Sequence, residues 1–327
     1  MKLILIVDGG TTNLRVTAVS ADDHRALAKS TAAGGVKHTA VDGDNHQLKR
    51  LLKQCVHDVL EQTGCTEADV ERCIAFGMIT SNMGLYEIPH LIAPVGIKEL
   101  RAGMKRKVFP EIAPFEIEFI PGVRNFSGTV DEDTCAAMDM MRGEEVEAIG
   151  LYDAVKPNQA ALFVLPGSHN KFVKMDEQGR IGGCMTSISG EMLDAITHDT
   201  ILADALNHSF CSAETYDRHM AICGAQACMN SGLGRAAFSG RILNTIGSMS
   251  ADKVQSWLLG AVMAEDVRAM TAFESAAPQV YIAGKAPIQQ AMRDVLEAVS
   301  GVKAVCVPAE TSALMGLHGA LIIAGME

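Results

Sequence analysis

Two segments of the chain share one pattern of apolar and polar positions, and each predicts a β-hairpin with glycine in its turn. In the first, the polar turn Asp8–Asn13 lies between the apolar stretches Leu3–Val7 and Leu14–Val19. In the second, Pro166–Lys171 lies between the apolar stretch Ala161–Leu165 and its predicted partner strand Phe172–Met175. Glycine-containing polar turns between apolar runs are typical of hairpins. The pattern therefore suggests two related lobes.

The segment after the first hairpin has the spacing of an amphipathic helix, and Gly64 follows as a stop signal. Arg25–Thr31 precedes it as a third predicted strand, and Cys73–Met78 follows it as a fourth. The first lobe is thus expected to contain three strands, a helix and a further strand, in this order. The apolar helical positions are Leu48, Leu51, Leu52, Cys55, Val56, Val59 and Leu60.

The second half of the chain repeats this order. Ile181–Ile188 predicts its third strand, and a helix of about 18 residues is expected over Gly190–Asn207. Ser250 is a candidate cap for a later helix. Further predicted elements are a helix over Asp252–Met270, a strand over Val280–Ala283, a helix from Pro287 and a terminal helix over Ser312–Ala324.

Composition narrows the function classes. The 327 residues are 48% hydrophobic with a net charge of −11, which suits a folded protein and argues against general nucleic-acid binding. No apolar stretch is long enough to span a membrane. The nine cysteines contain no Cys-x-x-Cys pair, and His219 with Cys223 falls short of a metal-ligand set. We therefore expect reduced thiols and a cytoplasmic location.

The two predicted turns have the chemistry of phosphate-binding loops. Glycine lets the backbone approach a ligand, and successive amides can form an anion-binding concavity. Asp8 at the strand end can hold a hydrated Mg²⁺, and Arg15 can reach a phosphate. Neither a Walker motif nor a Gly-x-Gly-x-x-Gly follows a predicted strand. The candidate ATP- and phosphate-binding residues are Asp8, Gly9, Gly10, Thr11, Thr12, Asn13, Arg15, Gly167, Ser168, His169, Lys171 and Gly284.

Ordinary tight hairpins would also account for each turn taken alone, and His169 can equally be structural. Gly284 ends a predicted strand before a helix, a junction that attracts phosphates but is common in α/β proteins. The two turns together favour the phosphate-binding interpretation.

Five segments carry motifs that are much less specific alone than in combination. They are Asp8–Arg15, Gly77–Gly84, Met141–Glu145, Pro166–Lys171 and Ser189–Glu191. In combination they resemble the 2-keto-3-deoxygalactonate kinases of the acetate and sugar kinase, heat-shock chaperone and actin superfamily, and the similarity extends over nearly the whole chain. Val146 and Glu147 replace a Thr-Gln pair that is frequent in this family, and Lys285 follows Gly284, so the fine specificity stays open.

The resemblance implies an α/β, two-lobed actin-like (ribonuclease H-like) fold with a ligand cleft between the lobes. Residues 1–140 plus 312–327 would bind the sugar acid, and residues 141–311 would bind ATP. The reaction implied is phosphoryl transfer from MgATP to the 6-hydroxyl of 2-keto-3-deoxygalactonate. Such kinases resemble one another in having an aspartate near an interlobe helix. We favour Asp139 as the base, with Asp131, Asp133 and Asp153 as alternatives, and Glu144 as a second candidate near the magnesium.

A sugar acid also needs a cation or amides for its carboxylate and polar groups for its hydroxyls. The candidate substrate-binding residues are Gly34, Gly35, Thr80, Ser81, Asn82, Gly84, Glu87 and Arg124. Kinases of other small sugars and a non-enzymatic actin-like ATP switch remain alternatives, and a homodimer is a base-rate expectation. The epimer preference is left open, because it depends on a few hydrogen bonds.

Overall fold

The structure, a computed structural model, describes residues 1–37, 39, 43–274 and 279–326 and contains two compact units. The first comprises residues 1–154, 179–183 and 314–327; Glu327, the last residue of the predicted first lobe, lies outside the described residues. The second comprises residues 155–178 and 184–313.

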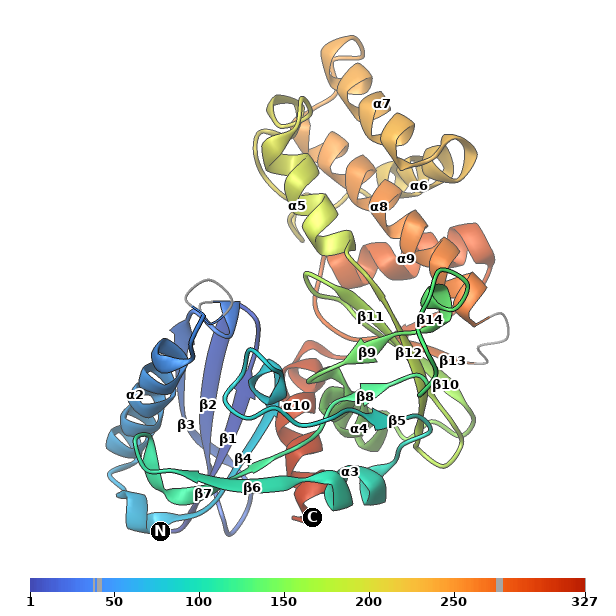
Figure 1. The fold of residues 1–327 in the computed structure, drawn as a ribbon. Helices are drawn as coiled ribbons and strands as arrows, with labels where there is room; N and C mark the ends of the chain where they lie inside the picture. The colour runs from blue at the N-terminus through green and yellow to red at the C-terminus, as the bar shows by residue number, and fades with distance from the viewer. Residues whose placement is uncertain (38, 40–42, 275–278, 327) are drawn as a thin grey trace. The chain divides into compact units, whose positions relative to one another are not determined.

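A six-stranded sheet forms the centre of the first unit, with strand order β3-β2-β1-β4-β7-β6. The strands β1 and β2 form an antiparallel hairpin, whereas β1, β4 and β7 run parallel. Helix α2 lies along the sheet and buries Leu48, Leu52 and Val59 against it (Figure 1). Its elements are β1 (Leu3–Gly9), β2 (Asn13–Ser20), β3 (Ala26–Ala33), α2 (His46–Thr63), β4 (Val70–Gly77), β6 (Lys105–Phe109) and β7 (Ala113–Phe119).

A small three-stranded sheet, one short helix and two closely packed longer helices complete the described part of the first unit. A Cβ at Gly150 of α4 would lie 2.0 Å from the Met315 carbonyl oxygen, and one at Gly319 of α10 would lie 1.9 Å from that of Val146. The two helices therefore touch through backbone at both glycines. The elements are β5 (Leu91–Ile92), α3 (Ile97–Gly103), β8 (Val123–Arg124), β9 (Met140–Met141), α4 (Glu144–Val155) and α10 (Ala309–Ala324).

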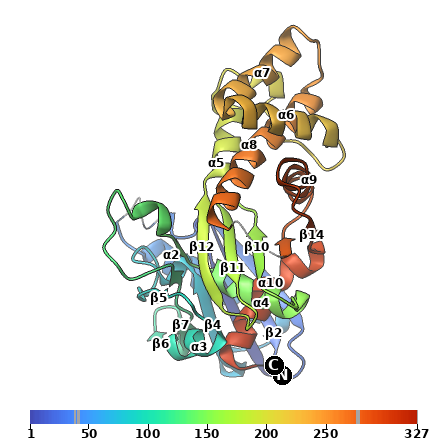
Figure 2. The ribbon, with the colours of Figure 1, turned by 90° about the vertical axis from the view of Figure 1, so that its right-hand side faces the viewer.

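The second unit has a five-stranded sheet of order β12-β11-β10-β13-β14 and five helices, of which α6, α7 and α8 pack together (Figure 2). Apolar residues of α8 and α9 supply much of its core. The elements are β10 (Ala161–Leu165), β11 (Asn170–Met175), β12 (Ile181–Ser187), α5 (Ser189–Asp199), α6 (Arg218–Ser231), α7 (Leu233–Thr245), α8 (Ala251–Phe273), β13 (Gln279–Ile282), α9 (Ile288–Ser300) and β14 (Ala304–Cys306). Single 3-10 turns cover Glu67–Asp69, Met78–Thr80, Cys135–Ala137 and Asp204–Leu206.

Both large sheets have the same local topology, as the sequence predicts. In each, the first strand pairs antiparallel with the second and parallel with a strand that follows a helix. One predicted boundary is wrong: the helix expected over Gly190–Asn207 ends at Asp199. Thr200 adopts extended backbone angles, and its hydroxyl donates to the Ile196 carbonyl, which ends the helix eight residues early. Ser250 does precede α8, but its side chain makes no capping hydrogen bond.

The contact between α4 and α10 gives a test of the packing. Gly150→Ala should destabilise the protein by about 2 kcal/mol, because its methyl group would overlap the Met315 carbonyl. In the control Gly234→Ala, on α7, the added methyl group meets no atom within 4 Å. This control should stabilise the protein by up to about 1 kcal/mol, because alanine is the better helix former. Urea denaturation measures both, and equal effects of the two substitutions would contradict the packing.

Candidate active site

The turn between β1 and β2 is held by short contacts. Asp8 faces Arg15 across the hairpin, and the Arg15 Nη1 lies 2.7 Å from the Asp8 Oδ2. The Gly10 amide donates to the Asn13 carbonyl at 2.9 Å, which closes the turn. Both charged side chains are partly exposed, so they remain accessible to a ligand.

The predicted loop at Gly34 and Gly35 packs directly on this turn. The Gly34 amide donates to the Thr12 carbonyl at 2.7 Å, and the Lys37 amide donates to the Thr11 carbonyl at 3.0 Å. A Cβ at Gly35 would lie 2.0 Å from the Gly10 carbonyl oxygen. Glycine is therefore required at position 35. The loop predicted to bind the sugar acid thus lies against the turn predicted to bind phosphate.

Three glycines bring three backbone segments together at the carboxyl ends of β1 and β4. Gly9 pairs with Gly77 in the parallel register, and a Cβ at Gly77 would lie 2.8 Å from the Gly9 carbonyl oxygen. Gly77 has a φ of 88° and Gly143 one of 114°, values that favour glycine. A Cβ at Gly143 would lie 3.4 Å from the Gly77 Cα, so the start of α4 reaches the same point.

Acidic side chains at the start of α4 lie in this region. Burial raises the pKa of Glu145 to about 8, with a smaller contribution from the charge of Glu144. The Gly143 amide donates to both carboxylate oxygens of Glu145 at 2.9 Å. Burial also raises the pKa of Glu147, and the charges of Glu144 and Asp8 raise it further. Asp8 therefore lies close enough to Glu147 to act on it electrostatically.

The predicted substrate segment 80–84 is partly structural. The Thr80 hydroxyl donates to the Gly77 carbonyl at 3.0 Å, and the Ser81 hydroxyl donates to the Met78 carbonyl at 2.7 Å. A Cβ at Gly84 would lie 2.2 Å from the Ile79 carbonyl oxygen, so this glycine serves a close turn. Asn82 and Glu87 are exposed, and their predicted contacts with substrate stay predictions.

Beside this segment lies a basic cluster of Arg142, His90 and Arg124, of which the sequence predicted only Arg124. The Arg142 guanidinium donates to the Thr80 hydroxyl at 2.8 Å and to the Ile88 carbonyl at 2.7 Å. Its Nη2 also lies 3.4 Å from the Nδ1 of His90. Burial, and then the charges of Arg142 and Arg124, lower the pKa of His90 to about 4. Within the motif Met141–Glu145, the sequence suggested a functional role only for Glu144.

Asp139, the predicted base, directly precedes β9. Its Oδ1 accepts from the Met140 amide at 2.6 Å, and its carbonyl accepts from the Asn125 amide at 2.9 Å. Its side chain is half-buried, whereas the alternatives Asp131, Asp133 and Asp153 are exposed. Asp131 accepts from Thr134 in a local turn, where the hydrogen bonds of Thr134 lower its pKa. The assignment of the base stays a prediction.

The second turn is organised by a buried carboxylate that sequence reasoning missed. The Gly167 amide donates to the Asn170 Oδ1 at 2.9 Å, and the Asn170 Nδ2 donates to the Asp266 Oδ2 at 2.6 Å. The hydroxyls of Ser187 and Ser189 both donate to the Asp266 Oδ1 at 2.5 Å. Asp266, 1% exposed on α8, thus joins the turn to the start of α5. Its place among the apolar residues Val262, Met263 and Val267 of α8 was the available signal.

The other predicted residues of this turn differ in their surroundings. The His169 Nε2 lies 3.0 Å from the Glu191 Oε1, and both side chains are exposed. Lys171 is buried, and its Nζ donates to the Thr186 hydroxyl. Gly284, with a φ of 93°, lies beside Pro166, and its amide donates to the Ser312 hydroxyl at 3.1 Å. The predicted roles of all three at a phosphate stay predictions.

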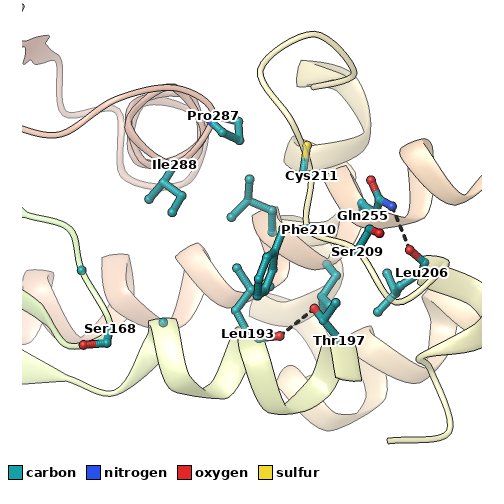
Figure 3. A pocket seen from close by; sticks show the side chains of 14 residues that line it. Ser168, Leu193, Thr197, Leu206, Ser209, Phe210, Cys211, Gln255, Pro287 and Ile288 are labelled. Atoms are coloured by element: carbon teal, nitrogen blue, oxygen red, sulfur yellow. Dashed lines mark hydrogen bonds between the residues drawn. The ribbon is translucent and has the colours of Figure 1, made fainter. Parts of the chain in front are cut away.

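A cavity of about 290 Å³ opens beside this turn within the second unit. Figure 3 shows Pro287 and Ile288 across it from Leu193, with the Phe210 ring between the surrounding helices. Its wall is mostly apolar, and Gly167 and Ser168 supply a polar end. The lining residues are Gly167, Ser168, Gly190, Leu193, Thr197, Leu206, Ser209, Phe210, Cys211, Gln255, Leu258, Leu259, Pro287 and Ile288.

Two general properties of the described residues bear on the site. No group of three or more histidine, cysteine, aspartate or glutamate side chains among them is arranged to hold a metal ion. None of the described helices combines the length and the apolar composition that crossing a membrane requires.

Comparison with known proteins identifies related chains. Residues 8–320 match the family model described as 2-keto-3-deoxy-galactonokinase. The 2-dehydro-3-deoxygalactonokinase of Escherichia coli (strain K12) is 25% identical over 81% of this chain and 80% of its own length. A protein of Rhizobium meliloti (strain 1021), named a probable 2-dehydro-3-deoxygalactonokinase, is 26% identical over 64% of this chain. That match spans 60% of the relative's own length.

A solved structure confirms the fold. The crystal structure of a Sinorhizobium meliloti protein, provisionally named as a 2-dehydro-3-deoxygalactonokinase, superposes with a TM-score of 0.76. It is 22% identical and covers 97% of this chain and 98% of its own. Together with the sheet topology, it confirms the predicted two-lobed actin-like α/β fold.

The buried Glu145 predicts a pH dependence of stability. The pKa of Glu145 is about 8 in the folded protein and near 4.5 in the unfolded chain. Its contribution to stability is therefore complete below pH 4.5 and is lost as the pH rises through about 8. Glu145→Gln cannot ionise, so its stability relative to wild type should rise over this interval by a few kcal/mol, at roughly 1.4 kcal/mol per unit of pKa shift. Urea denaturation from pH 5 to pH 8.5 measures this difference. Glu71→Gln, at an exposed position, is the control, and parallel profiles of wild type and Glu145→Gln would refute the prediction.

Proposed function

Since this chain belongs to the 2-keto-3-deoxy-galactonokinase family, we propose that it transfers the γ-phosphoryl group of ATP to the 6-hydroxyl of 2-keto-3-deoxy-D-galactonate. Membership of a kinase family implies the use of ATP. The observation that carries the proposal is that the family match runs from Asp8 to Ala320 and so includes both glycine turns. The name of the Escherichia coli relative supports the same substrate.

The cavity of the second unit suits the nucleoside of ATP. Apolar walls with a few polar groups are typical of sites for flat heterocycles. Leu193, Leu258 and Ile288 offer apolar surface for the base, and Gly167 and Ser168 place backbone and hydroxyl groups at one end. The start of α5 lies beside these residues, since the Glu191 amide donates to the Ser168 carbonyl at 3.1 Å. A helix start with nearby amides favours phosphate.

The first turn suits the metal-bound phosphates. Mg²⁺ needs one or two protein carboxylates when phosphates and water supply its other ligands. Asp8 is a partly exposed carboxylate at the end of β1, and its neighbour Arg15 can turn to a phosphate oxygen. When bound, the ion would neutralise charge on the phosphates, and the amides of Thr11 and Thr12 in the turn would orient them.

Substrate and base are assigned to the first unit. The carboxylate of Asp139 can accept the proton of the 6-hydroxyl as the oxygen attacks the phosphorus, while ADP leaves with the bridging oxygen. The proposed contacts of the sugar acid are Gly34, Gly35, Thr80, Ser81, Asn82, Gly84, Glu87 and Arg124. A cytoplasmic location fits the free cysteines of the described chain, and a homodimer is retained as a proposal.

The activity is tested directly. Protein supplied with ATP, Mg²⁺ and 2-keto-3-deoxygalactonate should release ADP and form the 6-phosphate. Asp139→Asn should lower kcat by roughly 10²-fold and leave the nucleotide affinity unchanged, because an amide cannot accept the proton. Asp153→Asn, exposed on α4, is the matched control. Failure to phosphorylate any 3-deoxy-2-keto sugar acid would reject the function, and normal turnover of the Asp139 variant would remove this residue from the base role.

The nucleoside cavity makes a separate prediction. Ile288→Trp should fill part of the cavity and weaken ATP binding at least about 10-fold, because a bulkier side chain would occupy the volume of the base. Ile246→Trp, 78% exposed after α7, makes the same substitution outside the cavity and should leave binding unchanged. Isothermal titration calorimetry with ATP measures both. Equal affinities of the two variants would place the nucleoside elsewhere.

A further inference from the structure

One face of the small β5–β8–β9 sheet gathers three nitrogen-rich side chains. Val123 of β8 pairs with Leu91 of β5 and with Met141 of β9. The preceding row of the sheet therefore holds His90, Gly122 and Arg142 side by side. Side chains alternate along a strand, so Arg124 projects from the same face as Gly122, roughly 7 Å further along β8.

Gly122 lets the side chains on either side of it meet. A Cβ at this position would lie 2.7 Å from the Arg142 Cγ and 2.9 Å from the His90 Cδ2. Without that atom, the guanidinium and the imidazole fold across the glycine, and the Arg142 Nη2 reaches the His90 Nδ1 at 3.4 Å.

This contact determines where His90 carries its proton. A guanidinium can only donate, so the His90 Nδ1 must accept. Burial and the two neighbouring arginines lower the pKa of His90 to about 4, so the ring is neutral at physiological pH. A neutral imidazole that accepts at Nδ1 carries its hydrogen on Nε2. The Nε2 of His90 is thus an N–H donor.

Two donors of this face have no acceptor. The His90 Nε2 and the Arg124 Nε are both buried and have no hydrogen-bond partner among the described residues. Buried donors without acceptors are costly, and each one needs an explanation. Both atoms donate, and a guanidinium charge lies close by, so an oxygen anion with two acceptor atoms would suit them.

We propose that the His90 Nε2 and the Arg124 Nε bind the carboxylate of the sugar-acid substrate, and that Arg142 is a positioning residue that holds the His90 tautomer. This inference rests on the proposed function. Arg142 directly precedes Gly143, which lies beside Gly77 at the end of β4. The carboxylate end of the substrate is thereby held in the same unit as the first turn, while its distant hydroxyl can extend toward that turn.

The charges around the cluster suit this assignment. Glu87 acts electrostatically on Arg142, so part of the Arg142 charge is already balanced. The Arg124 guanidinium and the neutral His90 ring therefore remain available to bind an anion. Ile92 and Met140 flank Arg124 across the sheet and are 44% and 60% exposed, which leaves apolar surface for the deoxygenated carbon of the substrate.

The test compares 2-keto-3-deoxygalactonate with its carboxamide, which differs only in the anionic group. Wild type should prefer the acid at least about 100-fold in kcat/KM. Arg124→Gln and His90→Phe should each reduce this preference at least 10-fold through KM, with ATP affinity unchanged. Arg50→Gln, an equal charge change at an exposed position of α2, should keep the full preference. Variants that discriminate as wild type does would overturn the proposal.

Arg142 is tested by a spectroscopic readout. In wild type, the ¹⁵N chemical shifts of His90 should report hydrogen on Nε2, and in Arg142→Gln they should report a mixture of tautomers. Unchanged shifts would remove Arg142 from the positioning role.

A wild-type protein that phosphorylates no sugar acid would reject the proposed function, and the anion site would then be decided by ligand-observed NMR with pyruvate, the smallest 2-keto acid. Pyruvate binding that is lost in Arg124→Gln and kept in Arg50→Gln would support the site. Binding that is absent or equal in both variants would overturn it.

Discussion

The close approach of backbone at Gly9, Gly77 and Gly143 is the constraint on which the first unit's site depends. At this point a hairpin turn, the end of β4 and the start of α4 lie within contact distance, and a Cβ at Gly9 or Gly77 would overlap atoms already in place. Because the three segments meet, residues separated by more than a hundred positions share one small region. Asp8, Thr80 and Arg142 are examples, each only a few residues from one of the glycines. The Gly35 loop adds a fourth segment by the same means.

In the second unit, a buried polar network positions the turn. Its turn is positioned through Asn170 by the carboxylate of Asp266, which also accepts from Ser187 at the end of β12 and from Ser189 at the start of α5. Burial raises the pKa of Asp266, whereas the serine and asparagine hydrogen bonds lower it and so favour the charged form. A satisfied network of this kind specifies one arrangement, because losing any partner leaves a buried group unpaired. The similar hairpins are therefore held by different interactions.

Much of the fold could be predicted from local pattern. Apolar runs on either side of a glycine turn identified both hairpins, and the spacing from Leu48 to Leu60 identified α2. The end of α5 could not be read in this way, because Thr200 leaves helical geometry within a segment whose apolar spacing continues. His90, Arg142 and Asp266 were missed for another reason. Each owes its importance to partners dozens of residues away, and a single sequence does not reveal such contacts.

The distribution of charge differs between the chain as a whole and the regions around Asp8 and the small sheet. The chain carries a net charge of −11, which would repel an anionic sugar acid and the phosphates of a nucleotide if it were spread evenly. Near Asp8, the raised pKa values of Glu145 and Glu147 favour their neutral forms and so limit the local negative charge. On the neighbouring small sheet, Arg124 and Arg142 concentrate positive charge, and burial keeps the His90 donor neutral and fixed in direction. Burial thus favours the neutral form of acids that would repel an anion, and it leaves two donors without partners at the proposed anion site. In this way an acidic protein can offer a site for anions without becoming basic overall.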